Sequence, residues 1–193
     1  MRIVAGRFRG AHLATPKDSA IRPTTDRVRE AIFNILSHGA GAVSLEGARV
    51  LDLFAGTGAL GLEALSRGAA YALFMEEAAE ARGLIRRNVE ALGATGITRI
   101  FRRDATRLGE IGTMKPFNVV FADPPYGKGL AEKALIAAAN GGWLTSGATV
   151  IVDERADSGF TPPPGFETLD IRSYGDTAVA FLCFTQSFPE RAK

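Results

Sequence analysis

Five short apolar runs alternate with helical segments from residue 48 onward, and this pattern limits the possible folds more than any other feature. Continuous apolar runs of this length are typical of parallel strands that are buried on both faces. Two further strands, around a turn at residues 172–176, predict a terminal antiparallel pair. The sequence therefore predicts an α/β fold with a seven-stranded, mostly parallel, Rossmann-like sheet. The expected strands are Arg49–Phe54, Tyr71–Met75, Ile97–Arg102, Asn118–Ala122, Thr149–Val152, Glu167–Ile171 and Thr177–Phe184.

The chain is expected to form one domain, because 193 residues with 46% hydrophobic and 23% charged side chains suit one core and no linker-like stretch interrupts them. Residues 48–185 would form the core. Residues 1–38 would form a basic extension, with a short hairpin of Arg2–Ala5 and His12–Ala14. A helix would then begin near residues 23–26.

Targeting signals and metal ligands are scarce in this sequence. No export signal or membrane-spanning run is recognisable, so a cytoplasmic location is expected, with no membrane partner. The single cysteine, Cys183, excludes an internal disulfide. With only two histidines beside it, we expect no metal site.

A glycine-rich loop follows the first core strand and contains Gly56-x-Gly58-x-x-Gly61. Such a loop lies at the carboxyl end of a parallel sheet, where ligands bind. It is formally a dinucleotide fingerprint, but Asp52 directly before it would repel a pyrophosphate. A carboxylate there suits a cationic ligand, and the loop resembles that of class I S-adenosylmethionine-dependent methyltransferases. The expected cofactor contacts are Asp52, Phe54, Ala55, Gly56, Thr57, Gly58, Glu76, Asp104 and Ala105.

Two of these contacts are carboxylates at the ends of later strands. Glu76 fits the acceptor that the ribose hydroxyls of the cofactor require, and Asp104 fits an acceptor for the adenine amino group. The alternative is that both are ordinary solvated charges at strand ends. The glycine loop favours the functional interpretation.

Asp123-Pro124-Pro125-Tyr126 follows the fourth predicted strand and lies at the same edge of the sheet. An exocyclic amine on a base is a poor nucleophile, because its lone pair is delocalised into the ring. The Asp123 carboxylate and the Pro124 carbonyl can accept the two amine protons, and consecutive prolines make the backbone rigid. Tyr126 offers a face on which an unpaired base can stack. The motif predicts methylation of an amino nitrogen, and the alternative is a structural turn.

Basic residues are concentrated at the start of the chain. Residues 1–30 hold seven Lys or Arg and three Asp or Glu, a net charge of +4. Such a segment can neutralise phosphates, although a solvated protein surface would explain it equally well. The candidate RNA contacts are Arg7, Arg9, Arg22, Thr24, Arg27 and Arg29.

Several stretches together resemble one family, the RsmD methyltransferases, which modify the N2 amine of guanine in bacterial small-subunit ribosomal RNA. They are residues 1–10, 21–34, 50–68, 121–127 and 174–177. The resemblance implies S-adenosyl-L-methionine as the cofactor, catalysis by Asp123, Pro124, Pro125 and Tyr126, and 16S rRNA as the substrate. It further implies that the substrate is a small-subunit assembly intermediate carrying ribosomal proteins.

Other enzyme classes share parts of this pattern. A DNA or RNA adenine-N6 methyltransferase would use both motifs, although a DNA enzyme normally needs a separate recognition region. Protein-amide methyltransferases have Asn where Asp123 stands. A carbon-directed pyrimidine methyltransferase needs a cysteine nucleophile, and Cys183 lies in an apolar strand. A dinucleotide oxidoreductase leaves residues 123–126 unexplained.

Overall fold

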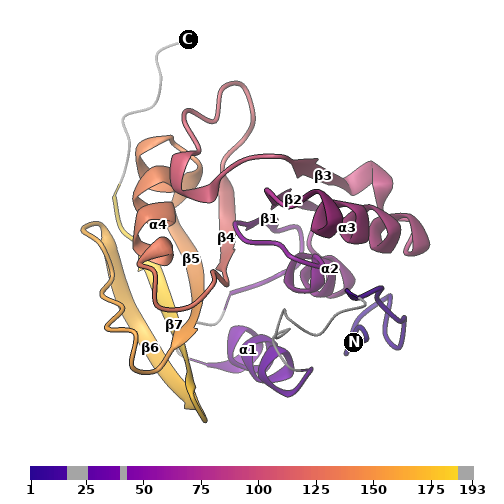
Figure 1. Cartoon of the computed structure of the whole chain (residues 1–193), viewed down its shortest axis with the longest axis horizontal. Coiled ribbons are helices and arrows are strands. Elements are labelled where there is room, and N and C mark those ends of the chain that lie inside the picture. Colours follow the sequence, from indigo (N-terminus) through magenta and orange to yellow (C-terminus); the bar gives the residue numbers. More distant parts are fainter. Residues whose placement is uncertain (17–25, 40–42, 187–193) are drawn as a thin grey trace.

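The computed structural model describes residues 1–16, 26–39 and 43–186, whose strands form one sheet with helices on both faces (Figure 1). The strands are β1 (Arg49–Asp52), β2 (Tyr71–Met75), β3 (Thr98–Phe101), β4 (Phe117–Ala122), β5 (Leu144–Arg155), β6 (Phe166–Tyr174) and β7 (Thr177–Phe184). The α-helices are α1 (Asp26–His38), α2 (Ala59–Ser66), α3 (Ala79–Ala91) and α4 (Leu130–Asn140), and the short 3-10 turns are η1 (Thr95–Ile97) and η2 (Ala105–Arg107).

The strand order is β3-β2-β1-β4-β5-β7-β6. Strands β1 to β5 pair in parallel, whereas β7 is antiparallel to both of its neighbours, β5 and β6. This is the seven-stranded sheet with a terminal antiparallel pair that the sequence predicts. The order reverses between β1 and β4, which is the point where open sheets of this kind bind ligands.

Alternate residues of each central strand enter two separate cores. Val119 and Phe121 of β4 belong to the core that α1, α2 and α3 cover, and Val120 and Ala122 belong to the core that α4 covers. Because successive side chains of a strand point to opposite faces, continuous apolar runs are needed where both faces are covered. The ring of Phe33 in α1 lies 5.6 Å from that of Phe121, measured between centroids, so α1 is part of the first core.

The clearest error in the predicted boundaries concerns β5. The prediction of residues 149–152 is too short, since β5 runs from Leu144 to Arg155. Its first half contains the exposed residues Ser146 and Gly147, which carry no apolar signal. Its last residues are charged, but they pair with β7 as far as Arg155 opposite Thr177. Backbone pairing with neighbouring strands, and not apolarity, thus sets the length of β5.

The N-terminal hairpin is less regular than expected. Its pairing amounts to one isolated antiparallel bridge between Arg2 and His12, with hydrogen bonds from Ile3 N to Ala11 O and from Gly10 N to Ile3 O, both 2.9 Å. Ile3 and Leu13 are buried in the first core, so the segment is packed against the body of the protein. Within the described ranges, no helix has both the length and the apolarity to cross a membrane.

Candidate functional site

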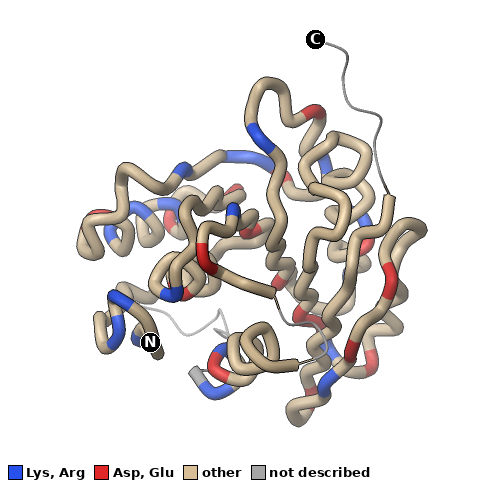
Figure 2. The backbone as a smooth tube through the Cα atoms, turned by 180° about the vertical axis from the view of Figure 1, so that it is seen from behind, with Lys and Arg blue, Asp and Glu red and all other residues tan. Residues whose placement is uncertain are grey.

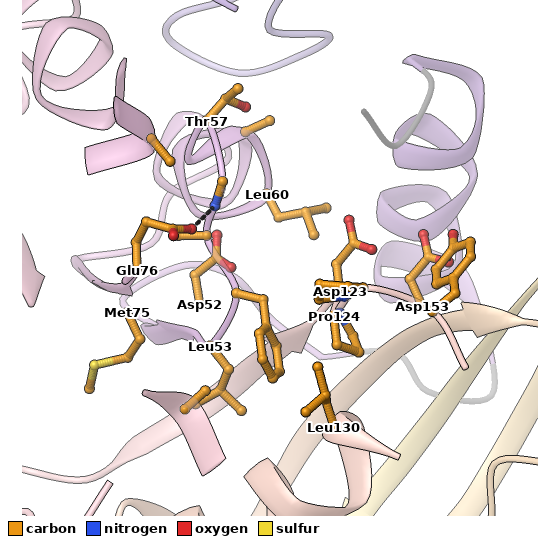
Figure 3. Close-up of a pocket in the computed structure, with 18 of the residues that line it drawn as sticks. Asp52, Leu53, Thr57, Leu60, Met75, Glu76, Asp123, Pro124, Leu130 and Asp153 are labelled. Atoms are coloured by element: carbon orange, nitrogen blue, oxygen red, sulfur yellow. Dashed lines mark hydrogen bonds between the residues drawn. The ribbon is translucent and has the colours of Figure 1, made fainter. Parts of the chain in front are cut away.

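A cavity of about 1120 Å³ opens at the edge of the sheet where β1, β2, β4 and β5 end. The glycine loop, the loop after β4 and the start of the chain all contribute to its wall. Figure 3 shows Asp52 and Glu76 on one side of this space and Asp123, Pro124 and Asp153 on the other. The two motifs that are far apart in the sequence therefore share one cavity.

The glycine loop connects β1 to α2. Phe54, Ala55, Gly56 and Thr57 line the cavity, whereas Gly58 is not among the lining residues. Gly58 has a φ of 79° and caps the start of α2 in the left-handed region, which favours glycine. The last glycine of the motif permits close packing, because a Cβ at Gly61 would lie 2.4 Å from the ring of Phe74. The loop geometry thus depends on these two glycines.

Asp52 is a buried carboxylate at the end of β1, with 1% of its surface exposed. Its Oδ2 accepts a hydrogen bond from Gly61 N at 3.2 Å, and its Oδ1 has no hydrogen-bond partner among the described residues. Burial, followed by the nearby charges of Asp123 and Glu76, raises the pKa of Asp52 to about 7. The carboxylate therefore lacks a positive partner among the described residues, and a cationic ligand would supply one.

Glu76 and Asp104 lie on the same wall of the cavity. Glu76 accepts hydrogen bonds from Gly56 N at 2.9 Å and Ala78 N at 2.8 Å, which ties the end of β2 to the glycine loop. The Oδ1 of Asp104 accepts from the hydroxyl and the backbone N–H of Thr106. These bonds, the hydroxyl first, lower the pKa of Asp104. Ala105 also lines the cavity, so both predicted carboxylates and their neighbours face one space.

The loop after β4 carries the predicted catalytic residues, and all four line the cavity. Pro124 is buried and Pro125 is exposed. The Tyr126 hydroxyl donates to Asp153 Oδ1 at 2.9 Å and lies 3.4 Å from Thr177 Oγ1. Burial raises the pKa of Tyr126 above its usual value, so the hydroxyl remains a donor.

Two acidic residues at the end of β5 were not predicted as part of the site. Asp153 and Glu154 are 2% and 4% exposed. Asp153 accepts from Tyr126, and Glu154 accepts from Gly127 N at 2.9 Å, so β5 holds the loop after β4. Burial and the charge of Asp123 raise the pKa of Asp153. The available signal was a pair of acids directly after an apolar run, at the ligand-binding edge of the sheet.

The predicted RNA contacts occupy different environments. Arg7 and Arg9 are exposed on the N-terminal segment, where Figure 2 shows basic positions, and Arg27 is exposed at the rim of the cavity.

Arg29 is fully buried. Its guanidinium donates to the carbonyl of Arg2 and lies 3.9 Å from Glu63 Oε2. Arg29 is nevertheless among the residues that line the cavity, and its expected RNA contact stays a prediction. Arg22 and Thr24 lie outside the described residues.

Buried polar groups hold the N-terminal segment against the body, and sequence reasoning missed them. Glu63 of α2 accepts from Val4 N at 2.8 Å and from Ala5 N at 3.0 Å. Asn88 of α3 accepts from Ala14 N at 2.7 Å and donates to Thr57 O in the glycine loop at 3.0 Å. One amide therefore joins the N-terminal segment to the predicted cofactor loop.

The strand order, the acidic glycine loop and the shared cavity define the class: the chain belongs to the class I S-adenosylmethionine-dependent methyltransferases. An RNA methyltransferase from Salinibacter ruber, solved with S-adenosyl-L-homocysteine, has the same fold at 16% identity, with a TM-score of 0.64 over 87% of this chain and 97% of that one. The fold class predicted from the sequence is confirmed.

The family is shown by closer matches. The model of a family described as conserved hypothetical protein 95 matches residues 1–183. Ribosomal RNA small subunit methyltransferase D of Escherichia coli K12 is 42% identical over 85% of this chain and 79% of its own length. The Haemophilus influenzae protein of the same name is 32% identical over 91% of this chain and 89% of its own. A solved Escherichia coli structure, yhhF, superposes with a TM-score of 0.80 at 35% identity, covering 96% of this chain and 98% of that one. The chain belongs to this family, the RsmD family, as its sequence predicts.

Proposed function

We propose that this protein transfers a methyl group from S-adenosylmethionine to the N2 amine of one guanine in the 16S rRNA of the small ribosomal subunit. The observation that carries the proposal is that residues 123–126 and the glycine loop line the same cavity. The names of the relatives, ribosomal RNA small subunit methyltransferase D, support ribosomal RNA as the substrate.

The residues of the cavity fit the proposed cofactor. Asp52, whose Oδ1 has no partner among the described residues, would face its positive charge, and Glu76 would accept from the ribose hydroxyls. Asp104, an ionised acceptor beside Ala105, would receive the adenine amino group. S-adenosylmethionine supplies an electrophilic methyl group on a positively charged sulfur.

The loop after β4 would bind the target. The Asp123 carboxylate and the Pro124 carbonyl would accept the two protons of the amine, so that its lone pair points away from the ring and toward the cofactor side of the cavity. The Tyr126 ring would stack on the base, a contact worth about 1–3 kcal/mol. Most of the rate acceleration of methyl transfer would then come from positioning, because an in-line displacement needs the amine nitrogen aligned with the methyl carbon of S-adenosylmethionine.

Residues 1–38 would serve as the RNA-binding arm of a single catalytic domain. The exposed Arg7, Arg9 and Arg27 are the described candidates for phosphate contacts. Because the target lies in ribosomal RNA, we propose an assembling subunit with its ribosomal proteins as the substrate. The cytoplasm, where subunits are assembled, would be the place of action.

Purified protein, S-adenosylmethionine with a labelled methyl group and small-subunit particles test the proposal. Digestion of the rRNA should release labelled N2-methylguanosine. The Asp123→Ala variant should lose transfer and still bind the cofactor, whereas Glu167→Ala, on the exposed face of β6, should behave as the wild type. Label recovered only as N6-methyladenosine, or loss of cofactor affinity in Asp123→Ala, would contradict the assignment.

A further inference from the structure

The side chain of Tyr126, in the loop after β4, is held at both ends. Its backbone follows two prolines, and its hydroxyl donates to Asp153 of β5 at 2.9 Å. The hydroxyl of Thr177 of β7 lies 3.4 Å away. The bond to Asp153 restricts the rotation of the Tyr126 ring, and it does so most strongly when Asp153 is ionised, because a hydrogen bond to an ionised acceptor is roughly twice as strong as one between neutral groups. Figure 3 shows Asp153 on the same side of the cavity as Asp123 and Pro124.

Burying the carboxylate of Asp153 at this position lowers the stability of the folded protein. Asp153 is 2% exposed. The groups that act on it are Asp123 and Tyr126 from the loop after β4 and Glu154 on its own strand. The uncharged Thr177 of β7 lies next to the Tyr126 hydroxyl. The charged neighbours of Asp153 are thus carboxylates, and burial together with Asp123 raises its pKa. An uncharged amide would be less costly to bury there, so stability alone does not explain a carboxylate.

We propose that Asp153 is a positioning residue for methyl transfer, whose carboxylate holds the Tyr126 hydroxyl and so fixes the ring on which the target base stacks. The inference rests on the proposed function of the loop. Asp153 acts through Tyr126 and need not touch the base itself. The neighbouring Glu154, which accepts from Gly127 N at 2.9 Å, holds the backbone of the same loop.

Steady-state kinetics of Asp153→Asn, Tyr126→Phe and the double variant test this inference. Tyr126→Phe keeps the stacking face and removes the tether, so kcat should fall roughly tenfold to a hundredfold, with KM for the RNA changed less than about threefold. Asp153→Asn keeps a neutral acceptor, and kcat should fall by a smaller factor, about three- to tenfold. The double variant should be no slower than Tyr126→Phe, because both changes act on the same bond and Tyr126→Phe already removes it.

Thermal melting separates this role from a structural one. At about pH 8.5, where the buried Asp153 is ionised, Asp153→Asn should melt no lower than the wild type, since it removes a buried charge next to Asp123. A variant that loses both stability and activity would make Asp153 a structural residue and overturn the proposal. An unchanged kcat, or losses that multiply in the double variant, would overturn it as well. Failure of the wild type to methylate RNA would instead refute the proposed function, so the two failures are distinguishable.

Discussion

Replacing Asp52 with asparagine should stabilise the protein at alkaline pH while weakening cofactor binding. Asparagine keeps an oxygen that can accept from Gly61 N and removes the buried charge. Burial raises the pKa of Asp52 from 3.8 to about 7 in the folded state. Below pH 3.8 both the folded and the unfolded chain carry the protonated acid, and Asp52 costs nothing. As the pH rises toward 7 the unfolded chain ionises first, so the wild type loses stability relative to the variant.

The size of this effect follows from the shift. At about 1.4 kcal/mol per pKa unit, the full cost above the folded-state pKa is roughly 4 kcal/mol. Between about pH 5.5 and about pH 8.5, the advantage of Asp52→Asn over the wild type should grow by about 2 kcal/mol. For a chain of this size, that corresponds to a further separation of the melting temperatures by about 4–8 °C.

Calorimetric melting of both proteins at the two pH values is the assay. Asp104→Asn is the matched control: the hydrogen bonds from Thr106 lower the pKa of Asp104, so its ionisation is complete at both pH values and its effect should not change between them. Titration calorimetry should show S-adenosylmethionine binding weakened roughly tenfold by Asp52→Asn at the higher pH. At the lower pH the loss should be smaller, because the wild type is largely protonated there. A melting difference between Asp52→Asn and the wild type that is the same at both pH values would show that the pKa of Asp52 is not raised by burial.

Three further predictions concern the N-terminal segment. Glu63→Ala leaves a buried guanidinium without this carboxylate and should lower the free energy of unfolding by about 3–5 kcal/mol, as denaturant titration will measure. Asn88→Ala removes the bonds between the N-terminal segment and the glycine loop and should weaken cofactor binding about three- to tenfold in equilibrium dialysis, with little change in kcat at saturating cofactor. If Arg7 and Arg9 contact phosphates, replacing both with glutamine should reduce the slope of log K against log salt by about 1.5, whereas Lys133→Gln on α4 should leave it unchanged.

The sequence was sufficient to predict the sheet because the fold needs continuous apolar runs. Strands β1, β2 and β4 are buried over almost their whole length, so their apolar runs end within two residues of the strands, whereas β3 is only partly buried. The length of β5 could not be predicted in this way, because its first half holds exposed residues at a shift in its register with β4 and its end holds acids that pair with β7. Strand length there is a property of the neighbouring strands.

Side-chain roles that depend on long-range contacts were hidden for a related reason. Arg27 and Arg29 are both arginines near the start of α1, and the sequence does not distinguish them. In the structure Arg29 is buried beside Glu63, whereas Arg27 is exposed. Asp153 is 27 residues from Tyr126 in the sequence, and only the pairing of β4 with β5 brings them together. The glycine loop and residues 123–126 could be recognised because their chemistry is contained in consecutive residues.

We propose above that this protein methylates the N2 amine of one guanine in small-subunit rRNA by means of Asp123. Mass spectrometry of the nucleosides of that rRNA, from cells that lack the gene and from the same cells supplied with the wild type or with Asp123→Ala, tests it most directly. We expect N2-methylguanosine at one position to disappear in cells that lack the gene, to return with the wild type and not to return with Asp123→Ala. An rRNA in which N2-methylguanosine is unchanged by loss of the gene, or in which the missing modification lies on another nucleoside, would contradict it.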